Sequence, residues 1–278
     1  MFNVFRLTIK EIARKRIFVV GLVLTAIYLT LFAVALHYTV RDTVMEGVQL
    51  IWMKQMGYQF MCLGWYLSTL VIGALMIIIA SGSLASEMET GTILGLASRP
   101  LGRGAIFAGK FMAYLLTGLL YSMVLLISIA LMCNHSFELM LSLKALLLGA
   151  AIFLLFPLLL LAVTFLGSSS LGTMAAAVTG FLLFSLAIVA GFTEQIGAFI
   201  HNAHLITVGI VGSLIMPGDA IYRLAIYQAG GELGASPIAG FGPFGTASLP
   251  SSWMLVYTVV YIIIILMIAW RRFAWRDL

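Results

Sequence analysis

The stretch from residue 145 to residue 166 reads Ala145-Leu-Leu-Leu-Gly-Ala-Ala-Ile-Phe-Leu-Leu-Phe-Pro-Leu-Leu-Leu-Leu-Ala-Val-Thr-Phe-Leu166, and it contains no charged side chain. A bilayer core of about 30 Å is crossed by about 20 helical residues, which is close to the length of this run. Its apolar residues would surround a helix on every side, and this suits a lipid environment better than a helix that faces water. The stretch therefore predicts a transmembrane helix.

Five further windows have the same character and hold no Lys, Arg, Asp or Glu. They are Ile17–Leu36, Cys62–Leu84, Phe111–Met132, Thr173–Thr193 and Trp253–Trp270. The first of them is longer than the apolar core of about 7–15 residues in a secretory signal, and no small-residue cleavage site follows it. We therefore expect an all-α polytopic membrane protein with six transmembrane helices in a single domain.

The overall composition leads to the same expectation. Of the 278 residues, 63% are hydrophobic and only 9% are charged, whereas about a quarter of a soluble domain is charged. Water therefore cannot be the main solvent of this surface. The net charge of +5 with two Cys and four His also argues against a disulfide scaffold, a zinc module or a nucleic-acid binder.

The basic residues predict the orientation of the chain. All 15 Lys and Arg lie in residues 1–16, in the loop 85–110 or in the tail after residue 270, except Arg41, Lys54, Lys144 and Arg223. Positive charge in membrane proteins accumulates on the cytoplasmic side. We therefore expect both termini and loop 85–110 in the cytoplasm, with the chain in a prokaryotic plasma (inner) membrane.

Residues 1–16 have a helical pattern of their own before the first span. Phe5, Ile9 and Ile12 recur with helical spacing while the basic side chains lie off that stripe. This predicts an amphipathic helix in the membrane interface, with an ordinary basic flank as the alternative.

Residues 194–252 form the longest stretch outside the predicted spans, and it is rich in Gly and Pro after residue 230. We expect an external loop that contains one short helix at Pro217–Gln228. Residues Ile196–Met216 could form a seventh span, but polar residues stand at one end of it and a seventh span would move the tail arginines outside. The sequence therefore favours a re-entrant or interfacial segment between the fifth and sixth spans.

Catalytic chemistry finds little support in the chain. Residues Gly104–Lys110 fit the phosphate-loop pattern, but Phe111 follows where a Ser or Thr must bind Mg²⁺. The six windows contain no acidic residue for an intramembrane protease or an ion-coupled carrier. We expect no enzyme activity, no cofactor in this chain and an energy source on another subunit.

Two features leave alternatives open on the external side. His201 and His204 stand one helical turn apart and could bind copper with nearby Met and Cys side chains, or they could be ordinary interfacial residues. Cys62 and Cys133 could form a disulfide or act as small apolar residues at the span ends.

The fifth span carries a stripe of small residues. Gly172, Ala176 and Gly180 recur at every fourth position, which allows a second helix to approach closely. We expect this stripe to form a dimer interface with a second copy of the chain, although such stripes also relieve crowding within one bundle.

Loop 85–110 carries a pattern that is typical of a known family. It reads Ser86-Glu-Met-Glu-Thr-Gly-Thr-Ile-Leu94 and then Arg99-Pro-Leu-Gly-Arg-Gly-Ala-Ile-Phe-Ala-Gly-Lys110. This loop resembles the signature of ABC-2 type transporter permeases. That signature has an acidic residue, Gly-Thr, Pro with a following Arg, and Gly-Lys, in this order. The stretch Met216–Leu224 and the ending Phe273–Leu278 are similar to two further elements of that family. Pro-Leu-Gly-Arg-Gly brings the chain closest to the NosY-like subgroup, the permeases of nitrous oxide reductase maturation, although Met216 stands where that subgroup commonly has Asn.

The resemblance implies a permease subunit that a separate cytoplasmic ABC ATPase drives, with ATP and Mg²⁺ bound by that partner. It implies ATPase-coupling roles for residues of the loop, namely Glu87, Glu89, Gly91, Thr92, Arg99, Pro100, Arg103 and Lys110. The two glutamates would contact the ATPase, and the arginines would contact lipid headgroups or acidic partner residues. The mostly apolar spans favour an amphiphile, a lipid-like molecule or a peptide as the cargo. We expect export, and an external accessory protein could take part. The alternative is a membrane anchor that recruits cytoplasmic partners without transport.

Overall fold

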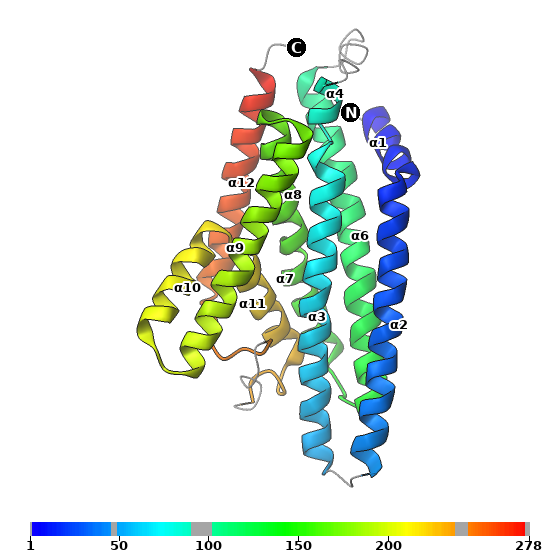
Figure 1. The fold of residues 1–278 in the computed structure, drawn as a ribbon, viewed down its shortest axis with the longest axis vertical. Helices are drawn as coiled ribbons and strands as arrows, with labels where there is room; N and C mark the ends of the chain where they lie inside the picture. Colours follow the sequence, from blue (N-terminus) through cyan, green and yellow to red (C-terminus); the bar gives the residue numbers. More distant parts are fainter. Residues whose placement is uncertain (1, 46–48, 90–101, 237–243, 276–278) are drawn as a thin grey trace.

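The computed structural model describes residues 2–45, 49–89, 102–236 and 244–275, and every regular element within these ranges is an α-helix. Figure 1 shows a bundle of long helices in which α1 begins and α12 ends at the same end. We name this the terminal end of the bundle, and we name the other the opposite end. The helices are α1 (Phe2–Arg14), α2 (Arg16–Met45), α3 (Leu50–Ser81), α4 (Ala85–Glu89), α6 (Arg103–Phe137), α7 (Leu143–Phe153), α8 (Leu155–Ser170), α9 (Thr173–Phe199), α10 (Ala203–Ile215), α11 (Gly218–Gly230) and α12 (Trp253–Ala274).

Six stretches of helix are long and apolar enough to cross a membrane, which confirms the predicted number of spans. α10 and α11 form an additional pair with a bend of 102° between them, and they would add a seventh span only if the pair were counted as one. The break comes at Met216 and Pro217, and the short helix predicted at Pro217–Gln228 is present as α11. The chain is therefore a polytopic membrane protein with a bent segment between its fifth and sixth spans.

Several helices depart from the predicted bounds. α6 begins at Arg103, so residues 103–110, which we assigned to a loop, form its first turns. α9 continues past Thr193 to Phe199. The run 145–166 is broken at Leu154 into α7 and α8, because Pro157 has no N–H to donate to the carbonyl of the residue four positions earlier.

The predicted amphipathic helix at the N-terminus is present as α1. Its buried side chains are Val4, Thr8 and Ile12, and this face packs against α6. Its basic residues lie on the exposed side. The chain then turns at Lys15 and continues as α2.

The core lies around α3 and α8. Trp65 on α3 and Phe165 on α8 are completely buried, and Phe165 contacts the aromatic rings of Phe107, Phe111 and Tyr114 from α6. In contrast, α2 and α12 expose most of their apolar side chains, which suits contact with lipid.

Candidate functional site

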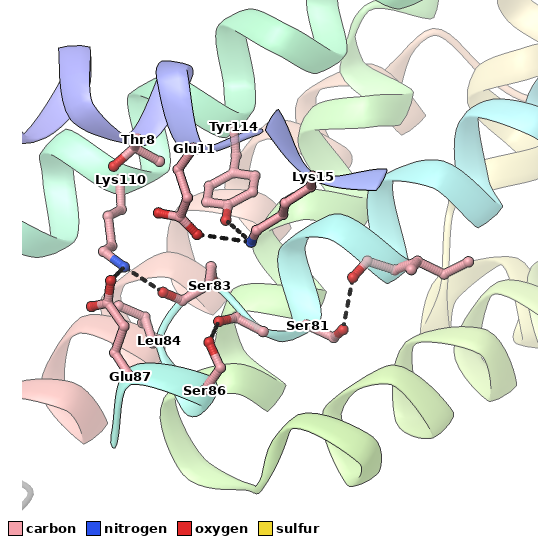
Figure 2. Close-up of polar contacts among 12 residues, drawn as sticks. Thr8, Glu11, Lys15, Ser81, Ser83, Leu84, Ser86, Glu87, Lys110 and Tyr114 are labelled. Atoms are coloured by element: carbon pink, nitrogen blue, oxygen red, sulfur yellow. Dashed lines mark hydrogen bonds and ion pairs between the residues drawn. The ribbon is translucent and has the colours of Figure 1, made fainter. Parts of the chain in front are cut away.

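A buried lysine of α6 joins this helix to α4 at the terminal end of the bundle. Lys110 on α6 places its Nζ 2.5 Å from Oε1 of Glu87 on α4, and it also donates a hydrogen bond to the carbonyl of Ser83 at 2.6 Å (Figure 2). The side chain of Lys110 is only 3% exposed. Its amine therefore lies inside the protein.

The turn between α3 and α4 is fixed by a side chain of α8. The hydroxyl of Ser168 accepts hydrogen bonds from the backbone N–H of Leu84 at 3.1 Å and of Ala85 at 3.0 Å. Because the first N–H groups of a helix have no partner within the helix, Ser168 satisfies donors that α4 would otherwise leave free. It also holds the Ser83 carbonyl near Lys110.

Glu89 joins α4 to α9. Its carboxylate accepts hydrogen bonds from the backbone N–H of Thr173 at 2.8 Å and from the Thr173 hydroxyl at 2.9 Å. An acidic group at the start of a helix is stabilised by the helix dipole. Gly172 leaves room for this carboxylate, since an added Cβ would lie 2.7 Å from its Oε1.

The junction between α1 and α2 is held to α6 near the same place. Lys15 Nζ lies 3.0 Å from Oε1 of Glu11 and donates a hydrogen bond to the Tyr114 hydroxyl at 3.2 Å (Figure 2). Burial alone would lower the pKa of Lys15, but the oxygens of Tyr114 and Glu11 outweigh it, so the pKa lies above its usual value. Lys15 therefore keeps its charge at neutral pH.

Arg103 joins the start of α6 to the end of α12. Its Nη1 donates a hydrogen bond of 2.7 Å to the carbonyl of Ala274. Basic groups at a helix C-terminus stabilise the last carbonyls. This contact lies within the chain, whereas we expected Arg103 to face lipid or a partner.

The predicted coupling residues thus fall into two groups. Gly91, Thr92, Arg99 and Pro100 lie outside the described residues. Glu87, Glu89, Arg103 and Lys110 are described, and all four contact other parts of the same chain. Glu87 and Glu89 therefore each have a partner within the chain, and their contact with an ATPase stays a prediction.

The predicted dimer stripe is occupied within the chain. Ala176 is completely buried, and its Cα lies 3.3 Å from the position that a Cβ on Gly167 of α8 would take. A Cβ added to Gly180 would likewise contact Ile77 of α3 and Thr164 of α8. Of the two interpretations of the stripe, close packing within one bundle fits the structure, and the assignment of Ala176 and Gly180 to a dimer interface does not.

A buried group of charges lies toward the opposite end, where the sequence predicted none. Arg223 of α11 is 1% exposed and binds Glu194 of α9 through two hydrogen bonds of 2.8 and 2.7 Å. Its Nε lies 2.8 Å from Oδ2 of Asp219, and its Nη1 donates to the carbonyl of Ser248 at 2.7 Å. These contacts hold α11 and the segment before α12 to α9.

This group of charges was not predicted because Glu194 lies one residue beyond the uncharged window that ends at Thr193. Asp219 and Arg223 were four residues apart on a predicted helix, and that spacing was the available signal for a charged pair. The pairing with Glu194 depends on tertiary contact. Gly191 leaves room for the carboxylate of Asp219, since a Cβ there would lie 2.0 Å from the carboxyl carbon of Asp219.

The structure bears on both alternatives that the sequence left open, the disulfide and the metal site. Cys62 and Cys133 are free and buried, so the disulfide is absent. Among the described residues, no group of three or more His, Cys, Asp and Glu side chains could hold a metal ion. The ring of His201 contacts the carbonyl of Ala198, and the backbone N–H of His204 donates to the Asn202 side chain.

The comparison with known proteins gave one result for the whole chain. The family profile described as ABC-2 family transporter protein matches residues 2–278. No curated protein matches the chain.

Proposed function

Since the chain belongs to the ABC-2 transporter family, we propose that it is the membrane permease subunit of an ABC transporter and that a separate ATPase subunit drives it. ATP and Mg²⁺ would be bound by that partner, and this chain would contribute no catalytic residue. The ATPase would dock on segment 90–101 and the helices beside it. This placement puts the terminal end of the bundle in the cytoplasm of a prokaryotic cell, in agreement with the distribution of Lys and Arg.

The contact between Glu87 and Lys110 is the observation that carries this proposal. It holds together the two helices between which segment 90–101 lies, while Glu89 and Ser168 connect α4 to α9 and α8. A displacement of the segment would therefore be transmitted to three long helices at once. Closely packed helices transmit strain because they have few alternative arrangements.

We further propose that two copies of the chain form the transport unit. Because α3 and α8 of the same chain cover Ala176 and Gly180, the contact between copies must use another face. α2, α9 and α12 each have a face that exposes apolar residues, and these faces could form the contact between two copies. An external accessory protein remains part of the proposal, on the side of α10 and α11.

The proposed function also includes a direction of transport and a class of cargo. We propose export, and the apolar helices favour an amphiphile, a lipid-like molecule or a peptide over a charged solute as the cargo. Membership of the NosY-like subgroup would instead point to copper or sulfur, and the identity of neighbouring genes tests that alternative. A membrane anchor without transport activity is the second candidate function.

Co-purification tests the permease against the anchor. The tagged chain is extracted from its native membrane, and the subunits that accompany it are identified by mass spectrometry and ATPase assay. We expect a nucleotide-binding subunit, and we expect Arg99→Glu in the loop to reduce its recovery. Arg41→Glu is the matched control, because Arg41 is exposed at the opposite end. Absence of any nucleotide-binding subunit would leave the permease without an energy source and would favour the anchor.

A further inference from the structure

A cavity of about 580 Å³ lies at the terminal end of the bundle, where the last turns of α8 and α12 pack against each other (Figure 1). The described residues that line it are Ser169 and Ser170 from α8, and Ile268, Arg271, Arg272 and Trp275 from the end of α12. Ile268 and Trp275 stand three or four positions from the two arginines, so all four lie on one face of the helix. The cavity therefore has serine hydroxyls on one wall and a cationic face on the other.

The two arginines give this cavity a net positive charge. Both side chains are exposed, and neither has an ion pair or a side-chain hydrogen bond within the described part of the chain. None of the described lining residues is acidic, and the two glutamates of α4 have other partners at this end. The C-termini of α8 and α12 contribute about half a negative charge each, which is less than the two full charges of the guanidinium groups. The cavity therefore attracts an anion.

The donors that line the cavity suit a phosphate group. Guanidinium groups bind phosphate oxygens through paired hydrogen bonds. The Ser169 hydroxyl donates to the Leu166 carbonyl at 2.8 Å, and it lies 3.4 Å from the hydroxyl of Ser170. A distance of 3.4 Å is long for a hydrogen bond between two hydroxyls. The Ser170 hydroxyl can therefore donate to a phosphate oxygen in the cavity instead.

The position of the cavity along α12 indicates that this phosphate belongs to a lipid. α12 has 22 residues and is therefore about 33 Å long, close to the thickness of the hydrocarbon core of a bilayer. Arg271 and Arg272 stand in its last turn, and Trp275 follows with 83% of its surface exposed. Exposed Trp side chains gather at the level of the lipid headgroups. Ile268 is exposed one turn deeper, where an acyl chain would lie.

We propose that this cavity binds the phosphate of an anionic phospholipid. Arg271 and Arg272 pair with the phosphate and Ser170 donates a hydrogen bond to it. Ile268 and Trp275 contact the acyl chain and the glycerol. Basic pockets between membrane helices on the cytoplasmic side hold headgroups of this kind. The proposal does not depend on transport, because a membrane anchor would bind the lipid equally well. The same phosphate chemistry could come from the free ion, and the experiment separates the two sources.

A lipid bound here would hold together the helices that surround the cavity. The Ala274 carbonyl, next to the cationic face, accepts the hydrogen bond of Arg103 from α6. Ser168, the residue before the serine wall, binds the first N–H groups of α4. A headgroup that bridges α8 and α12 would therefore stabilise contacts with α4 and α6 as well. Because a ligand that binds only the folded chain raises its stability, the lipid should raise the melting temperature.

The first measurement uses native mass spectrometry of the purified full chain, with phosphatidylglycerol and phosphatidylcholine of the same acyl chains as probes. We expect phosphatidylglycerol to be retained in preference. The double variant Arg271→Gln/Arg272→Gln should lower its affinity about twentyfold to thirtyfold, which is about fivefold for each charge. Arg6→Gln/Lys10→Gln is the matched control, because it removes two exposed charges at the same end but outside the cavity. Unchanged retention in the first variant, or an equal loss in the control, would overturn the proposal.

A second measurement distinguishes a defined site from diffuse attraction between a basic surface and an anionic membrane. Ser170→Ala leaves every charge in place and removes one donor to the phosphate, so the affinity for phosphatidylglycerol should fall about fivefold. Ser128→Ala is the control, because the Ser128 hydroxyl donates within its own helix, to the Val124 carbonyl. Diffuse attraction depends on charge alone. Wild-type affinity in Ser170→Ala would therefore overturn the site.

The third measurement follows thermal unfolding in phosphatidylcholine nanodiscs. Added phosphatidylglycerol should raise the melting temperature of the wild-type chain and have little effect on Arg271→Gln/Arg272→Gln. Without phosphatidylglycerol the two chains should unfold at similar temperatures, because both arginines are exposed. A variant that is destabilised equally with and without this lipid would show a structural role and overturn the proposal.

Two further arms identify other occupants. Inorganic phosphate should displace phosphatidylglycerol no better than chloride at the same ionic strength, and specific displacement by phosphate would assign the cavity to the free ion. If Arg271→Gln/Arg272→Gln retains phosphatidylglycerol but no longer recovers an ATPase subunit, the arginines bind an acidic surface of that partner and the lipid proposal fails. If the lipid binds as expected and no ATPase subunit accompanies the wild-type chain, the transporter proposal fails and the lipid site stands.

Discussion

Glu89, the last residue of α4, accepts hydrogen bonds from both the backbone N–H and the hydroxyl of Thr173, the first residue of α9. In the sequence, α6, α7 and α8 lie between these two residues. The contact joins the short helix before segment 90–101 to the fifth span. We expect this contact to serve coupling more than folding, because it lies at the exposed end of the bundle.

Glu89→Ala should therefore lower the ATPase stimulation by substrate while the amount of protein in the membrane stays unchanged. Thr173→Val removes the hydroxyl donor and should have a smaller effect in the same direction, since the backbone N–H remains. The measurement compares ATPase rates of the purified complex with and without substrate. Thr179→Val is the control, because its hydroxyl donates only within its own helix, to Ala175. Normal stimulation in Glu89→Ala would exclude this contact from coupling.

The ion pair between Glu87 and Lys110 should contribute to folding as well. Glu87→Lys would place two ammonium groups together in a nearly buried position and should lower the free energy of unfolding by about 3 kcal/mol. Glu87→Gln should cost less, because its amide oxygen can still accept a hydrogen bond. Thermal unfolding in detergent measures both variants. Glu232→Lys, an identical change at an exposed position, should have almost no effect.

Ala176→Leu tests how the small residues of α9 pack. Since Ala176 is completely buried against α8, three additional carbon atoms should lower the free energy of unfolding by about 1–3 kcal/mol. Ala175→Leu adds the same atoms at an exposed neighbouring position and should be tolerated. Thermal unfolding measures the difference, and efficient crosslinking of Cys at position 176 between two copies would contradict the packing described here.

Among the buried charged residues, Arg223 should be the one whose substitution destabilises the fold most. Arg223→Met would leave Glu194 and Asp219 without their cation and should destabilise the fold by about 3–5 kcal/mol. Arg223→Lys should rescue little, because an ammonium cannot reproduce the paired hydrogen bonds to Glu194. Protein yield and thermal unfolding report both effects. Lys144→Met, which removes an exposed cation at the same end, provides the comparison, and an equal loss in that variant would argue against a special role of Arg223.

The six spans could be predicted because lipid imposes a composition that a sequence shows directly. The break at Leu154 was less visible, since Pro157 stands inside an uncharged window and neither its composition nor its charge changes there. The bend between α10 and α11 was anticipated only as an alternative to a seventh span. Its angle depends on the packing of α11 against α7, which lies far away in the sequence.

The candidate site was predictable only in its location. Loop 85–110 stood out by its residues, but the partners of Glu87 and Glu89 could not be inferred from it. Glu87 meets Lys110 because Ser168 fixes the turn before α4, and Glu89 meets Thr173 because α8 and α9 return to the same end. Such pairs depend on the arrangement of helices in space, which no local pattern of residues contains.

The contact between Glu87 and Lys110 also has an evolutionary consequence. It holds α4 against α6, whatever the length of the chain between them. Insertions or deletions between residues 90 and 101 would then leave the helical framework intact, and the entropic cost of a longer loop grows only slowly with its length. Relatives of this chain could thus acquire different partners by changing this one segment, while the membrane-spanning part is inherited unchanged.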